Sequence, residues 1–198
     1  MEFRVATVTT GETRLVNLAG TFGESIPGIG VTATGRAENV RFEDIRFISP
    51  RLPATGSASF AFRVRPFSET LTEITVTEGV VQTGESNVHG DAVIHFGGET
   101  AQLVSVDARF DPLALSLVEQ LMGDTLPYRG TITGTARGSG GLINFDVNTR
   151  LTSADVRTPF ATHLTGQVFF SSAGFELRRV EADMREVPLL ALRAIIPG

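Results

Sequence analysis

The first residues whose types and spacing could do chemistry are metal-ligating ones. His89, Asp91 and His95 lie at positions i, i+2 and i+6, so on a strand all three project from one face. This spacing gives one close pair and one distant member, whereas a metal site needs its ligands together. The strand face opposite an apolar row is usually solvated. We therefore expect no metal site here, and we expect His163, which stands apart, to be a surface residue.

Paired carboxylates form the second group. Glu181 with Asp183, and Glu43 with Asp44, could serve as general acids and bases. Neither pair has a histidine or a nucleophile in a recognisable arrangement, and the chain has no G-x-S-x-G or H-E-x-x-H motif. Carboxylates on exposed strand faces are common. The sequence therefore predicts no catalytic residues, no cofactor and no enzyme.

The third group is the glycine-rich stretch LPYRGTITGTARGSGGLINFDVNTRL at 126–151. Phosphate-binding glycines follow G-x-G-x-x-G or G-x-x-x-x-G-K-S/T spacing and precede a helix. Neither spacing occurs from Gly134 to Gly141, and a strand pattern follows. Ile132 and the neighbouring threonines keep a period of two, which excludes a flexible linker. We interpret these residues as strand glycines followed by a turn at RGSGG.

The composition is that of an ordered, acidic chain. Of its 198 residues 41% are hydrophobic and the net charge is −5, and all 17 basic residues are arginines. Without a basic run to neutralise phosphates, we expect no nucleic-acid partner. The absence of cysteine excludes disulfides and thiolate metal sites. No run of about 18 apolar residues exists to span a membrane, so any targeting or anchoring segment is expected outside this chain.

A period of two dominates the chain and predicts an all-β fold. In 143–151 apolar or β-branched residues alternate with polar ones, as a half-buried strand requires, and 59–65 and 104–110 repeat the pattern. The other expected strands are 4–9, 15–20, 31–37, 40–48, 71–77, 87–96, 163–170 and 175–184. The phase changes at Glu43–Asp44 and at Arg178–Arg179, which predicts a β-bulge at each.

One segment has helical spacing instead. DPLALSLVEQLMG predicts a helix of about three turns, with Asp111 as N-cap, Pro112 at the first helical position and Gly123 just past the end. A second helix start is expected in VPLLALRAIIPG at 187–198. The sequence thus predicts antiparallel strands with one or two short helices.

A motif order recurs along the chain. Leu-Pro-x-x-Gly occurs at Leu52 and again at Leu126, an offset of 126 − 52 = 74. Gly90 and Gly166, and likewise Pro112 and Pro188, occupy matching contexts at an offset of 76. We therefore expect one repetitive sheet segment over 1–198, with a partial repeat at 1–51 and repeats at 52–125 and 126–198.

This ladder of short strands resembles the AsmA-like superfamily and is most similar to TamB-type translocation and assembly proteins. The resemblance rests on L-P-x-x-G-x-x-x-G at the start of a unit, on the hairpin LTGQVFF…FELRRVEADM and on the DPLAL helix start. It covers 52–198 well and 1–51 loosely. It implies a long curved sheet folded into a taco-like groove that is hydrophobic inside and stands in the periplasm.

The same resemblance carries the expectation of function. Such proteins are thought to carry phospholipids between the inner and outer membranes, or to assist outer-membrane assembly, and no catalytic residues come with the family. It implies that the acyl chains of phospholipids are one partner and the outer-membrane assembly machinery another. It also implies anchoring in the inner membrane through a segment absent from this chain.

The residues themselves make a groove plausible, because one or two short helices are too few to cover the apolar face of many strands. An open sheet would expose a lipid-binding row made of Phe60, Phe62, Val64, Ile143, Phe145, Val147, Val168 and Phe170. By alternation alone a closed core is the commoner outcome, and the resemblance favours the open groove.

Two alternatives remain open. The first is a structural or assembly module that binds client strands by β-augmentation. The second is a closed β-barrel that holds a small hydrophobic ligand. The internal repeat favours an extendable sheet over a barrel. Because the sequence has no lysine to discourage edge pairing, we also expect some self-association through the terminal strands.

Overall fold

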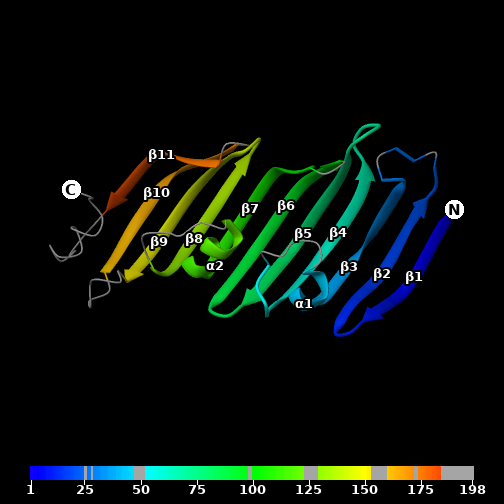
Figure 1. The fold of residues 1–198 in the computed structure, drawn as a ribbon, viewed down its shortest axis with the longest axis horizontal. Coiled ribbons are helices and arrows are strands. Elements are labelled where there is room, and N and C mark those ends of the chain that lie inside the picture. The colour runs from blue at the N-terminus through cyan, green and yellow to red at the C-terminus, as the bar shows by residue number, and fades with distance from the viewer. Residues whose placement is uncertain are drawn as a thin grey trace.

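The computed structural model describes residues 1–24, 26–27, 29–46, 52–97, 100–122, 129–152, 160–171 and 174–183. They form one antiparallel sheet of eleven strands whose spatial order follows the chain, accompanied by two short helices (Figure 1). The strands are β1 (Glu2–Thr10), β2 (Thr13–Phe22), β3 (Val31–Arg41), β4 (Ser57–Pro66), β5 (Thr72–Thr83), β6 (Ser86–Gly97), β7 (Thr100–Ala114), β8 (Arg129–Ser139), β9 (Leu142–Thr152), β10 (Phe160–Ser171) and β11 (Gly174–Asp183). The helices are α1 (Phe42–Ile45) and α2 (Leu115–Met122).

The sheet is open. The strand order runs from β1 to β11 without closing, so each of these two strands has a single neighbour in the sheet and they lie at opposite ends of Figure 1. The expected repetitive antiparallel sheet with short helices is therefore confirmed. The closed β-barrel alternative is wrong, because a barrel requires hydrogen bonds between the first and the last strand.

The glycine-rich stretch forms a strand and a turn, as expected. β8 contains Gly130, Gly134 and Gly138, and the next two residues, Gly140 and Gly141, have φ values of +60° and +82°. Two successive positive φ values are the geometry of a two-residue hairpin turn whose twist matches the flanking strands. The turn lets β9 return directly along β8, with Ser139 paired to Leu142.

The expected strand at 40–48, with a bulge at Glu43–Asp44, is wrong from Phe42 to Arg46, and its last two residues lie outside the described part of the chain. β3 ends at Arg41, and α1 begins at Phe42. The cause is tertiary, because the helical turn places Phe42, which is 5% exposed, against the buried residues Val40 and Ala58. A continued strand would leave Phe42 on the face that Val40 occupies but farther along it, beyond Ala58.

The expected helix at 111–122 begins later than its sequence signals indicate. β7 continues to Ala114, and α2 starts at Leu115, so Asp111 is not an N-cap. The strand persists because Leu113 pairs with Ile132 of β8, and the Ala114 N–H donates to the Ser86 hydroxyl at 2.9 Å. The second expected helix, at 187–198, lies outside the described residues.

Bulges interrupt several strands, and the one expected at Arg178–Arg179 is confirmed. The β10–β11 register shifts there, and Arg179 has a φ of +49°. Three others accompany positive φ values at Asn17, Asn39 and Glu78, in β2, β3 and β5. Each bulge moves the side chains that follow it by one place along the strand.

The expected repeat units remain a prediction. β1 to β3 and α1 lie within 1–51, β4 to β7 and α2 within 52–125, and β8 to β11 within 126–198. No helix in the described part of the chain is long and apolar enough to cross a membrane.

A glycine substitution tests how closely the strands approach one another. A Cβ atom on Gly134 would lie 2.2 Å from the Asp146 carbonyl oxygen, whereas one on Gly84, in a turn with φ of +52°, would meet no atom within 4 Å. Gly134→Ala should therefore lower the free energy of unfolding in urea by about 1 to 3 kcal/mol. Gly84→Asn should change it little, because asparagine tolerates positive φ. Equal urea midpoints for the two variants would contradict this packing.

Candidate apolar binding face

Strand pairing places one row of mostly apolar residues across the sheet. Phe62 on β4 pairs with Val76 on β5, and the pairing continues strand by strand to Leu177 on β11. Paired residues project from the same face of a sheet. The row, which we call the central row, consists of Phe62, Val76, Ala92, Val106, Gly138, Ile143, Val168 and Leu177.

A second row runs parallel to the first on the same face, closer to the helices. It begins at Val40 on β3 and ends at Ala182 on β11. We call it the helix-side row, and it consists of Val40, Ala58, Val81, Val88, Phe110, Gly134, Val147, Leu164 and Ala182. The face that carries both rows is the apolar face.

The residues expected to form a lipid-binding row lie on this one face, in two groups. Three of them, Phe60, Phe62 and Val64, alternate along β4. The others belong to β9 and β10, and the four strands from β5 to β8 separate the two groups. The members on β9 and β10 are Ile143, Phe145, Val147, Val168 and Phe170, of which the Phe170 side chain lies outside the described part.

Sequence reasoning missed the residues that join these groups. Val76, Ala92 and Val106 carry the central row across β5, β6 and β7. Their signal was present, because each lies in phase with the apolar alternation of its strand. Ala92 escaped notice because alanine is small, and strand order was needed to show that it lies beside valines on both sides.

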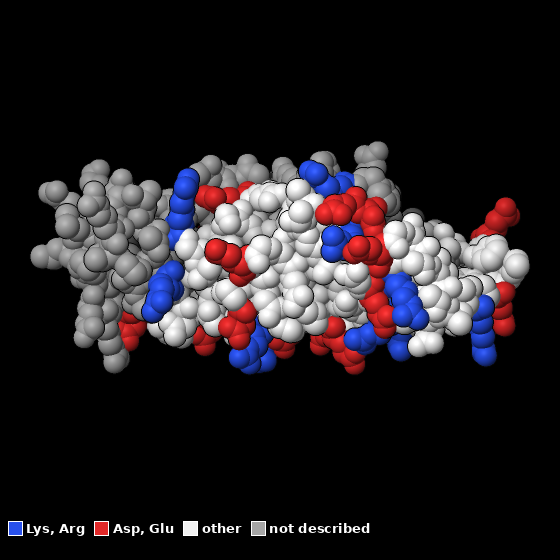
Figure 2. All heavy atoms as spheres, turned by 90° about the horizontal axis from the view of Figure 1, so that it is seen from below, with Lys and Arg blue, Asp and Glu red and all other residues white. Residues whose placement is uncertain are grey.

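The helices cover only part of the apolar face. α1 buries Phe42, and Leu115 at the start of α2 is 9% exposed. Away from the helices the face is half-exposed, and Leu177 at its end is 57% exposed. Figure 2, which views the molecule at 90° to Figure 1, shows broad uncharged areas, with acidic and basic side chains gathered between them and along the lower border. The apolar face is therefore a surface that the described elements leave largely uncovered.

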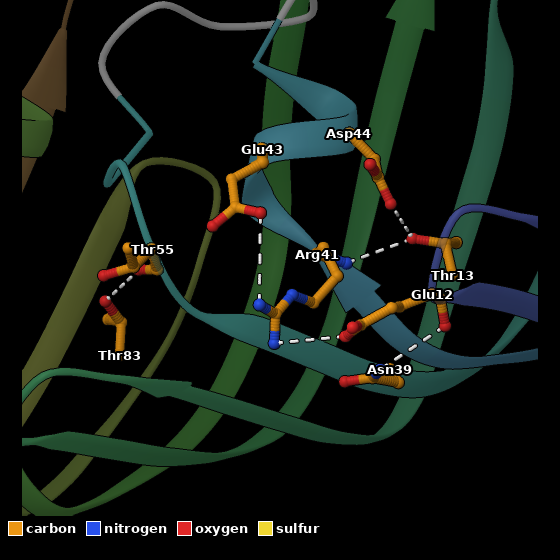
Figure 3. Close-up of polar contacts among 8 residues, drawn as sticks. All are labelled: Glu12, Thr13, Asn39, Arg41, Glu43, Asp44, Thr55 and Thr83. Atoms are coloured by element: carbon orange, nitrogen blue, oxygen red, sulfur yellow. Dashed lines mark hydrogen bonds and ion pairs between the residues drawn. The ribbon is translucent and has the colours of Figure 1, made fainter.

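A polar network fixes α1 at its end of the apolar face (Figure 3). The Arg41 guanidinium contacts the carboxylates of Glu12, at 3.4 Å, and Glu43, at 4.0 Å. The Thr13 hydroxyl donates to Asp44 at 2.7 Å and accepts from the Arg41 N–H at 3.1 Å. Glu43 and Asp44, weighed above as an acid–base pair, therefore hold the helix against the β1–β2 turn.

The opposite face carries polar side chains and one compact ionic cluster. Glu73 accepts from the Arg65 Nε at 2.7 Å and lies 3.4 Å from the Nε2 of His95. The Phe67 ring covers His95, with the ring centroids 3.9 Å apart. The hydrogen bond from Arg65 is the largest of the effects that hold the pKa of Glu73 below its ordinary value of 4.5.

The three candidate metal ligands on β6 do not come together in one site. His89 and Asp91 are exposed on β6, and Asp91 accepts from the Glu78 N–H at 2.9 Å, whereas His95 belongs to the Glu73 cluster. Within the described ranges no three His, Asp or Glu side chains are arranged to hold a metal ion.

His163 is exposed, as expected of a surface residue, and its Nε2 lies 3.0 Å from the Asp146 carboxylate. Glu181 and Asp183 are exposed on β11, near the end of the sheet. In the β10–β11 register Asp183 lies opposite His163, and Glu181 lies opposite Thr165.

Comparison with known proteins identifies no relative. No family model, no curated protein and no solved structure matches the chain. Membership of the AsmA-like superfamily therefore stays a prediction from the motifs.

The Glu73 cluster should make stability depend on acid pH. Because the pKa of Glu73 is lowered in the folded state, its contribution is present above about pH 4.5 and is lost as the pH falls through the folded value. At pH 7 the free energy of unfolding of Glu73→Gln should therefore be about 1 kcal/mol lower than that of the wild type. This difference between variant and wild type should become smaller near pH 3. Urea unfolding at both pH values measures this.

Glu78→Gln is the matched control for this experiment. Glu78 also pairs with an arginine, Arg36, but its side chain is 69% exposed. An exposed pair contributes little. The loss of unfolding free energy in Glu73→Gln could stay the same at both pH values, or Glu78→Gln could show the same loss. Either result would show that the cluster does not act through the charge of Glu73.

Proposed function

We propose that the apolar face shelters the acyl chains of phospholipids, in a segment of a periplasmic groove protein that links the inner and outer membranes. The observation that carries the proposal is the central row. It continues from β4 to β11 on a single-layer sheet, and no second layer of described strands covers it. Soluble domains rarely leave an extended apolar surface without a ligand or a partner.

The dimensions of the row suit a passive mechanism. Neighbouring strands lie about 4.8 Å apart, so the row from Phe62 to Leu177 is roughly 34 Å long. That length exceeds one leaflet of hydrocarbon, about 15 Å. An acyl chain lying along the row would be shielded from water at about 0.8 kcal/mol per methylene. Because neighbouring positions are chemically alike, a chain could move along the row without a chemical step.

The rest of the molecule fits the same role. The polar face keeps contact with water, where a phospholipid headgroup remains hydrated. α1 and α2 bury one end of the apolar face, so acyl chains would occupy the part that these helices leave half-exposed. The periplasmic location, the inner-membrane anchor outside this chain and the contact with the outer-membrane assembly machinery follow from the resemblance to TamB-type proteins.

One observation favours a second function. β1 and β11 each have one strand neighbour, and an unpaired edge offers backbone N–H and C=O groups to an extended peptide. A module that binds client strands by β-augmentation would use these edges and would leave the apolar face without a ligand.

Lipid binding can be tested by native mass spectrometry of the protein purified from bacterial membranes. The test variant carries Phe62→Thr and Ile143→Thr, which remove apolar area from the central row and keep good strand formers. We expect phospholipid to accompany the wild type, and its occupancy to fall at least about fivefold in the variant, since several buried methylenes lose their contacts.

Phe67→Ser is the matched control, because Phe67 is 55% exposed and lies against His95 on the polar face. Its lipid occupancy should equal that of the wild type, and circular dichroism checks that every variant keeps its strands. Absence of lipid from the wild type, or equal loss in the test and control variants, would contradict the proposal.

A further inference from the structure

The number of strands restricts how two copies of this sheet can join. Each strand runs antiparallel to the next, so in a sheet of eleven strands β1 and β11 run in the same direction. Antiparallel pairing between copies, with both apolar faces on the same side, therefore joins two identical edges. The two copies are then related by a twofold axis perpendicular to the sheet, which is the commonest symmetry of protein dimers.

The β11 edge carries a tripeptide that is complementary to itself under this symmetry. Glu176 and Arg178 project from the polar face, on either side of Leu177, which projects from the apolar face. The Glu176 and Arg178 side chains are 62% and 43% exposed. Leu177, at 57%, is more exposed than any other large apolar residue recorded within a described strand.

We propose that a second copy of this chain pairs with β11, antiparallel and centred on Leu177. In this register Glu176 of each copy lies opposite Arg178 of the other, and the two Leu177 side chains meet on the apolar face. Directly opposed side chains in an antiparallel pair have Cβ atoms about 5 Å apart, a distance that arginine and glutamate span easily. The axis is thus flanked by two ion pairs on one face and by a leucine contact on the other.

Arg178 is already positioned for this contact. Its guanidinium lies 2.8 Å from the Glu176 carboxylate of the same strand and 4.4 Å from the centroid of the Phe169 ring on β10. The hydrogen bond between Glu176 and Arg178 lowers the pKa of Glu176 and raises the pKa of Arg178, so both side chains are charged at neutral pH. In the dimer these four side chains form one network of alternating charge.

The β1 edge carries a similar tripeptide, Glu2-Phe3-Arg4, but it is less suited to pairing. The Phe3 side chain is half-buried, with its ring centroid 6.3 Å from that of Phe22. It therefore has less apolar area to gain than Leu177.

Pairing at β11 has a consequence for the apolar face. Leu177 is the last member of the central row, so joining two copies there continues the row into the second sheet. The row would then extend to roughly twice its length, about 70 Å at 4.8 Å per strand. The pairing itself does not depend on what the face binds, so it is measured without lipid.

Sedimentation velocity of the full chain over a concentration series tests the dimer. The wild type should dimerise, and Glu176→Arg or Arg178→Glu alone should raise the dimer dissociation constant at least about tenfold, because like charges then face each other across the axis. An equimolar mixture of the two variants should restore the dimer. So should the double variant E176R/R178E, which is again complementary to itself.

Glu2→Arg is the matched control, since it makes the same change of charge on the opposite edge and should leave the dissociation constant unchanged. Circular dichroism confirms that each variant is folded. A wild type that sediments as a monomer throughout the series would overturn the proposal, and so would a mixture that stays as monomeric as its two components. Loss of the dimer in Glu2→Arg would assign the contact to β1 instead.

Discussion

The structure depends on keeping the side-chain alternation of eleven strands in phase. A shift of one residue in any strand turns its apolar side chains to the opposite face. Where the apolar alternation in the sequence shifts by one residue, a bulge takes up that residue and keeps the apolar side chains on the same face. On β3 the odd-numbered Ala37 and the even-numbered Val40 both reach the apolar face, because a bulge at Asn39 inserts one residue between them. The same happens on β11, between Leu177 and Val180, at Arg179.

Much of the fold could be predicted from the sequence, because a period of two is a local property. It located most of the strands, the hairpin at Gly140–Gly141 and the bulge at Arg179. That the sheet is open did not follow from this period, because alternation alone favours a closed core. α1 could not be found in this way, because Phe42 and Ile45 also fit a strand pattern after a phase change. The helix forms because it packs Phe42 into the buried cluster around Ala37 and Ala58. This cluster exists only when β3 and β4 pair.

The sequence predicted which side chains within one strand share a face, but not that these side chains form a continuous row across the sheet. Alternation placed Phe60, Phe62 and Val64 together, but it gave no information on which strand lies beside which. Ala92 and Gly138 become part of a row only through their pairing with Val106. The carboxylates were open to misinterpretation for a related reason, because the Thr13 hydroxyl that binds Asp44 becomes its neighbour only in the folded chain.

The strand order, which simply follows the chain, also determines how this protein loses its structure. Each strand packs against the strands immediately before and after it, so stability is a sum of nearest-neighbour terms, as in solenoid proteins. Loss of one hairpin therefore removes contacts mainly with the strands that flank it. Unfolding can then proceed strand by strand from either end, with partly frayed sheets populated along the way, and a single two-state midpoint describes only an average over them.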